Sequence, residues 1–197
     1  MINNEITNLK LNYNDVLVRM GANKYRTKID TKIETSILEM MSLAKKILQP
    51  KYALSFAEKN IKDNKIFLDN FCINSKDIFK LLENSNLVCG LIATIGFSID
   101  TKISYLLERK DIMSAFILDS IGSVAIEELV ENICNDITTK YGTTTMRFSP
   151  GYGDWEIHNQ KKFLQWLGAE KLGIVLSSTF QMVPRKSVSA LVGITKK

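Results

Sequence analysis

The feature that most restricts how this chain can fold is a long helical pattern between residues 111 and 141. Apolar side chains recur there at the spacing of one helix face and point toward a core: Ile112, Phe116, Val124, Ala125, Leu129, Ile133 and Ile137. Shortly before it, residues 86–95 hold a nearly continuous apolar run that is typical of a buried strand. The sequence therefore predicts a core to which a long helix and a buried strand both contribute.

The rest of the pattern predicts shorter elements in irregular order. Helices are expected at 14–20, 31–48, 75–82, 98–107 and 158–167, and extended segments at 5–11, 52–57, 65–73, 143–148, 173–178, 179–183 and 187–195. Thr31 and Glu34 predict a capping box for the 31–48 helix, and Ser75 a cap for the next one. This order favours a mixed α/β (α+β) domain over a regular doubly wound sheet. We find no repeat or linker, and expect residues 1–197 to form a single domain.

Composition narrows the class of protein. The net charge of +5 fits either a charged solubilising surface or attraction of an acidic partner. Three separated cysteines and one histidine offer no clustered ligands, so no metal site is predicted, and this cysteine usage is typical of a reducing cytoplasm. The N-terminus has no signal-peptide pattern, and the apolar stretch 112–126 is shorter than the roughly 20 residues of a membrane span. We therefore expect a cytoplasmic protein without a membrane partner.

Several common functional motifs are absent from the sequence. There is no GxGxxG after a strand and no GxxxxGK[ST], so neither a Rossmann nucleotide site nor a P-loop is predicted. His158, the single histidine, has no spacing that supports a hydrolytic triad. Basic residues do not interleave with aromatic ones, so no nucleic-acid partner is expected.

The segment Met146–Trp155, MRFSPGYGDW, combines residue types that suit a small-molecule site. Gly151 permits unusual backbone conformations and close approach by a ligand. The planar guanidinium of Arg147 can grip a carboxylate through two charge-assisted hydrogen bonds. Tyr152 and Trp155 offer ring faces on which a cation such as a sulfonium can pack. A surface turn whose aromatic residues cap the core explains the composition at least as well.

A second candidate is Asp119, within the mostly apolar helical segment FILDSIGSVAI. A carboxylate there costs free energy unless it is paired or reaches water. Ser123 lies one turn later on the same face, and Gly122 allows close approach by another group. These residues predict either a small polar notch or, equally, a structural aspartate beside a glycine needed for packing. Arg185 and Lys186 are expected to form a solvated basic turn.

Several of these segments, taken in order, resemble the activation domain of cobalamin-dependent methionine synthase. RFSPGYGDW (147–155) is similar to the RxxPGY segment of that family, and STFQMVPRKSVSALVGI (178–194) to its TESxxMxPxxSVS ending. LDSIGSVAIEEL (118–129) is similar to its helix, and ATIG (93–96) to the strand end before that helix. The resemblance lies in a core part, 86–197, whereas the N-terminal part, 1–85, matches only in general pattern.

The resemblance implies a twisted, mainly antiparallel sheet with flanking helices. It also implies S-adenosylmethionine as ligand, with Arg147 on its carboxylate, Ser149 binding through its backbone, and Gly151 and Tyr152 against it. Asp119 and Ser123 are implied to line the same groove. The chain departs from the family at Ser123 and Ser178, where the family carries glutamates, and we expect the family's C-terminal extension to be missing.

By the same resemblance, we expect a stand-alone activation domain that acts in trans on a methionine synthase lacking its own. It is an accessory module with no catalytic residue: it presents the methyl group of S-adenosylmethionine to cob(I)alamin held by the partner. A flavodoxin- or ferredoxin-like protein supplies the electron. Two alternatives stay open, namely an activator of another corrinoid methyltransferase and an interaction module that has lost ligand binding.

Overall fold

The computed structural model describes residues 2–5, 9–22, 29–63 and 65–195. Its helices are α1 (Tyr13–Arg19), α2 (Thr31–Ile47), α3 (Lys76–Leu81), α4 (Ser98–Glu108), α5 (Ile112–Tyr141) and α6 (Gln160–Leu167), with short 3-10 helices at Ile157–Asn159 and Ala169–Leu172. Its strands are β1 (Ile2–Glu5), β2 (Lys51–Glu58), β3 (Asn60–Lys62), β4 (Lys65–Leu68), β5 (Phe71–Ile73), β6 (Leu87–Thr94), β7 (Thr143–Thr144), β8 (Val175–Leu176), β9 (Met182–Val183) and β10 (Ser187–Thr195).

The main sheet has five strands in the order β1-β2-β6-β10-β7, and every neighbouring pair is antiparallel. The apolar run predicted to be a buried strand is β6, which lies at the centre of this sheet. Strands β3–β5 form a small separate sheet, and β8 and β9 form a hairpin. The predicted mixed α/β class, with an antiparallel sheet and flanking helices, is therefore confirmed.

Both faces of the main sheet are buried, each in its own apolar cluster. Alternate residues of β6 and β10, such as Leu91 and Val192, face a cluster built with α1, α2, α4 and α5. The residues between them, such as Ile92 and Leu191, face a second cluster that contains Trp155 and Phe163. This two-sided burial explains why β6 is a continuous apolar run without polar alternation.

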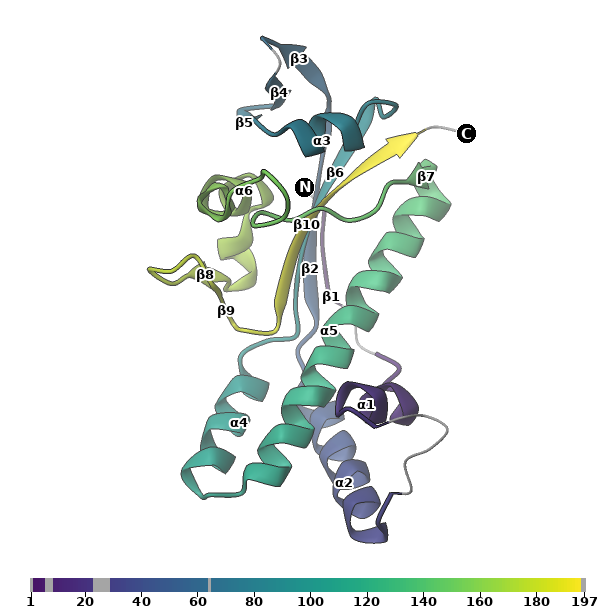
Figure 1. Cartoon of the computed structure of the whole chain (residues 1–197), viewed down its shortest axis with the longest axis vertical. Helices are drawn as coiled ribbons and strands as arrows, with labels where there is room; N and C mark the ends of the chain where they lie inside the picture. Colours follow the sequence, from purple (N-terminus) through teal and green to yellow (C-terminus); the bar gives the residue numbers. More distant parts are fainter. Residues whose placement is uncertain (1, 6–8, 23–28, 64, 196–197) are drawn as a thin grey trace.

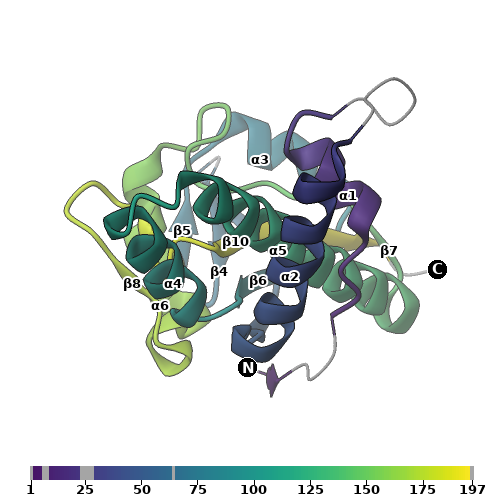
Figure 2. The same cartoon turned by 90° about the horizontal axis from the view of Figure 1, so that it is seen from below.

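The long helix predicted between 111 and 141 is α5, and it begins where the sequence indicated. The side chain of Asp111 accepts a hydrogen bond from the backbone N–H of Ser114 and so caps its first turn. Helix α5 packs against α1, α2 and α4. Figure 1 shows α5 running along the sheet from the end of the molecule where α1, α2 and α4 lie. Figure 2 shows these four helices together from below.

Three predictions for the N-terminal part are wrong in detail. The strand expected at 5–11 is β1 (Ile2–Glu5); residues 6–8 lie outside the described residues, and Leu9 is buried in the core. Helix α2 is capped by Asp30, whose side chain accepts from the N–H of Lys32, so the Thr31–Glu34 capping box is not formed. Residues 65–73 form two strands, because the chain turns at Asp69 with φ +52°.

Candidate functional site

The segment that joins α5 to α6 follows the edge of β10 that lies away from β6. Phe148 exchanges backbone hydrogen bonds with Leu191, at 3.0 and 2.8 Å. One residue later, the hydroxyl of Ser149 donates to the backbone oxygen of Ser189, at 2.7 Å. The chain then turns through Gly151, with φ +95°, and the buried indole of Trp155 ends the turn in the second apolar cluster. The turn is thus fastened at both ends while its middle, with Tyr152, stays exposed.

Arg147 opens onto a pocket between this segment, β10 and α5. We call it the Arg147 pocket; it has a volume of about 330 Å³ and is lined by Glu127, Met146, Arg147, Ser149, Tyr152, Val188 and Ala190. The side chain of Tyr152 lies edge-on to the ring of Phe148, with centroids 6.0 Å apart. The structure therefore brings three of the predicted residues, Arg147, Ser149 and Tyr152, to one pocket, with Gly151 between the last two.

Glu127 is the residue of this pocket that sequence reasoning missed. Its Oε2 lies 3.0 Å from Nη2 of Arg147, and the two side chains are 59% and 38% exposed. The guanidinium is therefore not locked into the interior but paired at the surface, where a solute can reach it. Glu127 follows Asp119 by eight residues, two helical turns on, so the spacing along α5 was the signal that could have found it.

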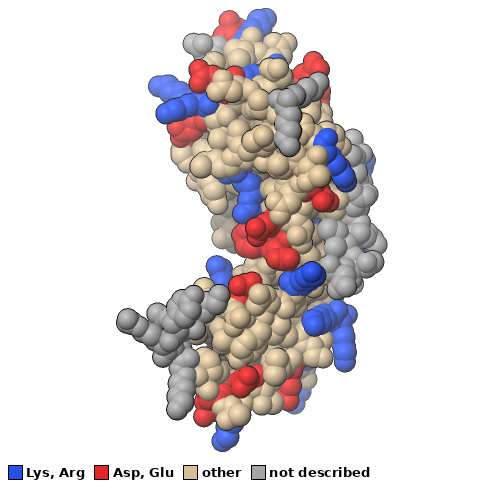
Figure 3. Space-filling view, turned by 90° about the vertical axis from the view of Figure 1, so that its right-hand side faces the viewer, with Lys and Arg blue, Asp and Glu red and all other residues tan. Residues whose placement is uncertain are grey.

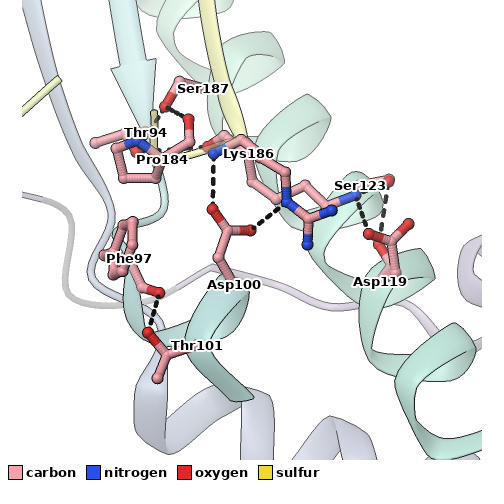
Figure 4. Close-up of polar contacts among 10 residues, drawn as sticks. Thr94, Phe97, Asp100, Thr101, Asp119, Ser123, Pro184, Lys186 and Ser187 are labelled. Atoms are coloured by element: carbon pink, nitrogen blue, oxygen red, sulfur yellow. Dashed lines mark hydrogen bonds and ion pairs between the residues drawn. The ribbon is translucent and has the colours of Figure 1, made fainter. Parts of the chain in front are cut away.

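Asp119 and Ser123 hold Lys186 instead of facing Arg147 directly (Figure 4). The Lys186 ammonium lies 2.9 Å from Oδ1 of Asp119 and donates to the hydroxyl of Ser123 at 2.8 Å. The lysine side chain is only 13% exposed, so the expectation of a solvated basic turn is wrong for Lys186. Its stem crosses α5 at Gly122, where an added Cβ would lie 3.2 Å from Cε of Lys186. The carboxylate of Asp119 is therefore paired within the chain by Lys186, as the structural alternative for this residue requires.

The neighbouring Arg185 is tied to helix α4 in the same region. The carboxylate of Asp100, which is buried, accepts from the backbone N–H of Arg185 at 2.7 Å and lies 3.4 Å from Nε of its side chain. The hydroxyl of Ser187 donates to the backbone oxygen of Pro184, at 2.7 Å (Figure 4). These contacts fix the approach to β10, and so the strand that forms one wall of the Arg147 pocket.

The turn is also connected to α3, in the N-terminal part of the chain. The carboxylate of Asp154 accepts from the hydroxyl of Ser75 and, at 2.7 Å, from the backbone N–H of Lys76. In return, the carboxylate of Asp77 accepts from the backbone N–H of Asp154, at 3.1 Å. The hydrogen bond from Ser75 is the main reason why the pKa of Asp154 lies below its ordinary value of 3.8.

A larger cavity, of about 670 Å³, lies on the other face of the sheet, between α6 and the β8–β9 hairpin. Its floor is apolar, with Leu164 and Ile174, and Ser178 stands at its border. Its lining includes Lys161 but no arginine, whereas the Arg147 pocket offers a guanidinium that can hold a carboxylate through two hydrogen bonds. Within the described residues, no three His, Cys, Asp or Glu side chains are grouped to hold a metal ion, and no helix is long and apolar enough to cross a membrane.

Charged side chains are mixed on the face shown in Figure 3. Asp and Glu side chains lie close to Lys and Arg side chains there, and neither sign forms one continuous patch. On this face, basic side chains therefore alternate with acidic ones and do not form a basic surface.

Comparison with known proteins identifies the fold but not a sequence family. No protein-family model and no curated protein matches the sequence. Among solved structures, the crystal structure of the MetH reactivation domain bound to AdoHcy is similar, with a TM-score of 0.77 and 14% sequence identity. The match covers 100% of this chain and 78% of that chain. The chain therefore has the fold of the MetH reactivation domain.

Proposed function

We propose that this protein binds S-adenosylmethionine in the Arg147 pocket and reactivates a cobalamin-dependent methionine synthase in trans. The observation that carries the proposal is an exposed guanidinium that borders an open pocket beside Tyr152. Further support comes from the similar fold of the MetH reactivation domain, which was crystallised with AdoHcy. The ligand class follows from the chemistry of the pocket, and the client from the resemblance of the sequence.

The Arg147 pocket has charges that match the amino-acid end of S-adenosylmethionine. That end carries a carboxylate and an ammonium, and the pocket offers the guanidinium of Arg147 and the carboxylate of Glu127, 3.0 Å apart. A zwitterion can replace the internal ion pair with two ligand contacts, so that neither side chain is left without a partner. The exposed ring of Tyr152 gives the sulfonium a π-face.

The energetics favour this exchange. An exposed ion pair such as Arg147–Glu127 contributes about 0–1 kcal/mol to stability, because water screens it. A hydrogen bond to a charged ligand group contributes about 1.5–3 kcal/mol once it is shielded. The free energy lost when the Arg147–Glu127 pair opens is therefore smaller than the free energy gained from the ligand contacts. Glu127 holds Arg147 in place and leaves it accessible to the ligand.

In this proposal the protein acts by positioning. When bound, S-adenosylmethionine supplies the methyl group, and cob(I)alamin on the partner accepts it. The chain holds the ligand at its amino-acid end so that the sulfonium faces outward from the surface, and such orientation accounts for a large part of a group-transfer rate. A flavodoxin- or ferredoxin-like donor reduces the partner, and the net charge of +5 suits an acidic carrier.

Titration calorimetry with S-adenosylmethionine tests the binding part of the proposal. We expect the wild-type protein to bind it and Arg147→Ala to lose about tenfold or more in affinity, as the loss of a charge-assisted hydrogen bond implies. Arg109→Ala, at an exposed arginine bonded to Tyr105, is the matched control and keeps wild-type affinity. Equal affinities for wild type and Arg147→Ala contradict the assignment of the site, and absence of binding favours an interaction module without ligand.

Reactivation is tested separately, with a methionine synthase that lacks its own activation domain. The oxidised synthase, a reductant and S-adenosylmethionine are mixed with and without this protein, and methylcobalamin is followed by its absorbance. We expect methylcobalamin to form only when the protein is present. If no methylcobalamin forms although the protein binds S-adenosylmethionine, the protein is used to capture partners from the native extract. Capture of another corrinoid methyltransferase would identify that enzyme as the client.

A further inference from the structure

The turn that carries Tyr152 makes reciprocal contacts with α3. Asp154 accepts from Ser75 and Lys76 of α3's first turn, and Asp77 accepts from the N–H of Asp154. Gly153, with φ +50°, lies so close that an added Cβ would be 2.0 Å from Oδ2 of Asp77. We call this set of hydrogen bonds the Asp77–Asp154 contact.

We propose that Asp154 and Asp77 are positioning residues for the ligand: their contact fixes the turn in the conformation that puts Tyr152 at the Arg147 pocket. The identity of the ligand rests on the function proposed above, whereas the control of the turn does not. Affinity at the pocket then depends on α3, which belongs to the N-terminal part of the chain.

The Asp77–Asp154 contact matters because the side chain of Tyr152 makes few contacts of its own. Its side chain is 59% exposed and meets Phe148 only edge-on, so its place is set by the backbone of the turn. On the pocket side, that backbone is fixed through Ser149, which donates to β10. On the far side it is fixed through Trp155 and the Asp77–Asp154 contact. If the contact is lost, the turn keeps its internal backbone hydrogen bonds, such as that from the N–H of Tyr152 to Ser149, but loses its polar attachment to α3.

A purely structural cap for α3 does not explain the arrangement. Ser75 already caps this helix, because its hydroxyl accepts from the N–H of Ile78 at 3.0 Å. The carboxylate of Asp154 adds to this cap by accepting from the N–H groups of Lys76 and Asp77, but the return hydrogen bond from the N–H of Asp154 to Asp77 caps nothing in α3. What the return bond adds is a fixed position for the turn.

Two variants separate positioning from stability. Asp154→Asn weakens the acceptor at the turn, and Asp77→Ala removes only the return hydrogen bond while leaving α3 capped by Ser75 and Asp154. Asp136→Asn, on the exposed surface of α5, is the matched control. Amide hydrogen exchange of Gly151, Tyr152 and Trp155 is measured without ligand, affinity by titration with S-adenosylmethionine, and the thermal midpoint in parallel.

We expect both variants to speed exchange at the three turn amides about tenfold and to weaken affinity by roughly five- to twentyfold, with non-additive effects in the double variant. Asp77→Asn keeps an acceptor for the N–H of Asp154 and restores most of the affinity lost in Asp77→Ala. Unchanged exchange at the turn, or unchanged affinity beside a lowered thermal midpoint, overturns the proposal. If the wild-type protein does not bind S-adenosylmethionine, the proposed function fails, and the exchange data still decide whether the contact holds the turn. Should Asp154→Asn fail to fold, Asp77→Ala carries the same test.

Discussion

The indole of Trp166 lies directly against the backbone of Gly90. A Cβ added at Gly90 would lie 2.2 Å from Cζ3 of Trp166 and 2.7 Å from Cδ2 of Leu167. The indole cannot easily withdraw, because it stacks on Phe71 and Phe163 and its Nε1 donates to Asp69 at 3.1 Å. Helix α6 can therefore reach the sheet only where β6 has a glycine.

Gly90→Ala is expected to lower the free energy of unfolding by about 1–3 kcal/mol, the usual cost of overpacking a core. Gly122→Ala is the control. Its Cβ would lie 2.9 Å from Cδ1 of Ile99 and 3.2 Å from Cε in the stem of Lys186, so it is crowded too, but less closely than at Gly90. Alanine also gains about 1 kcal/mol over glycine within a helix, so we expect a change within about 1 kcal/mol. Urea denaturation of the three proteins measures both values. Equal stabilities of Gly90→Ala and wild type would show that α6 moves freely on the sheet.

Local sequence patterns correctly predicted those elements whose hydrophobic pattern is long and has clear end signals. Helix α5 combines a long apolar face with a capping aspartate, and the central strand β6 is apolar on both faces, so both were found within about a residue. The short edge strand β1 has no such pattern: its register comes from pairing with β2, a tertiary contact. Asp30 was overlooked as a cap because Thr31 and Glu34 fit the capping box equally well.

The residues of the candidate site also differ in how far local sequence predicts their position. Arg147, Ser149 and Tyr152 lie within one turn, so their proximity follows from local sequence. In the sequence, Glu127 looks like any other surface glutamate. It meets Arg147 only because α5 packs beside the edge of β10, and local sequence does not predict this packing. The partnership of Lys186 with Asp119 was missed for the same reason, because the two residues are brought together only by the sheet and α5.

Glu127→Gln is expected to weaken binding of S-adenosylmethionine by about tenfold, because the ligand ammonium loses its anionic partner. The same variant should bind an analogue without the amino group about as well as the wild-type protein does. Glu128→Gln, at the next residue of α5, is the control and keeps wild-type affinity. Titration calorimetry with both ligands gives the comparison. Equal losses for the two ligands would mean that Glu127 acts only by holding Arg147.

The stability contributed by Asp154 should depend on pH in the acid range. Its pKa is lowered, mainly by the hydrogen bond from Ser75 and then by the N–H of Lys76, so the ionised form is favoured in the folded state. The contribution is therefore complete above the unfolded-state pKa of about 3.9 and is lost as pH falls through the lower folded value. We expect urea midpoints of wild type and Asp154→Asn to differ at pH 7 and to converge as pH falls below the unfolded-state pKa. A difference that stays constant throughout the acid range contradicts the assignment.

The cysteines should differ sharply in reactivity. Burial raises the pKa of Cys89 to about 12, and burial also raises the pKa of Cys134, although Arg147 opposes that shift. Cys72 is exposed. At pH 8, we expect one fast equivalent of thiol per native chain with a disulfide reagent such as dithionitrobenzoate, because thiolates are the reactive form. Cys72→Ser should abolish this phase, and fast labelling that persists in it would place Cys89 or Cys134 at the surface.

The segment that follows Gly142 also protects the sheet from other chains. Strand β7 pairs with β10 at Ile194 and Thr195, and among the described residues Phe148 and Ser149 cover the border from Leu191 back to Ser189. A nine-residue strand with an uncovered border is a template for intermolecular pairing and aggregation. Phe148 and Ser149 thus also cover this edge of the sheet, and variants that release them are expected to lose solubility before they lose their fold.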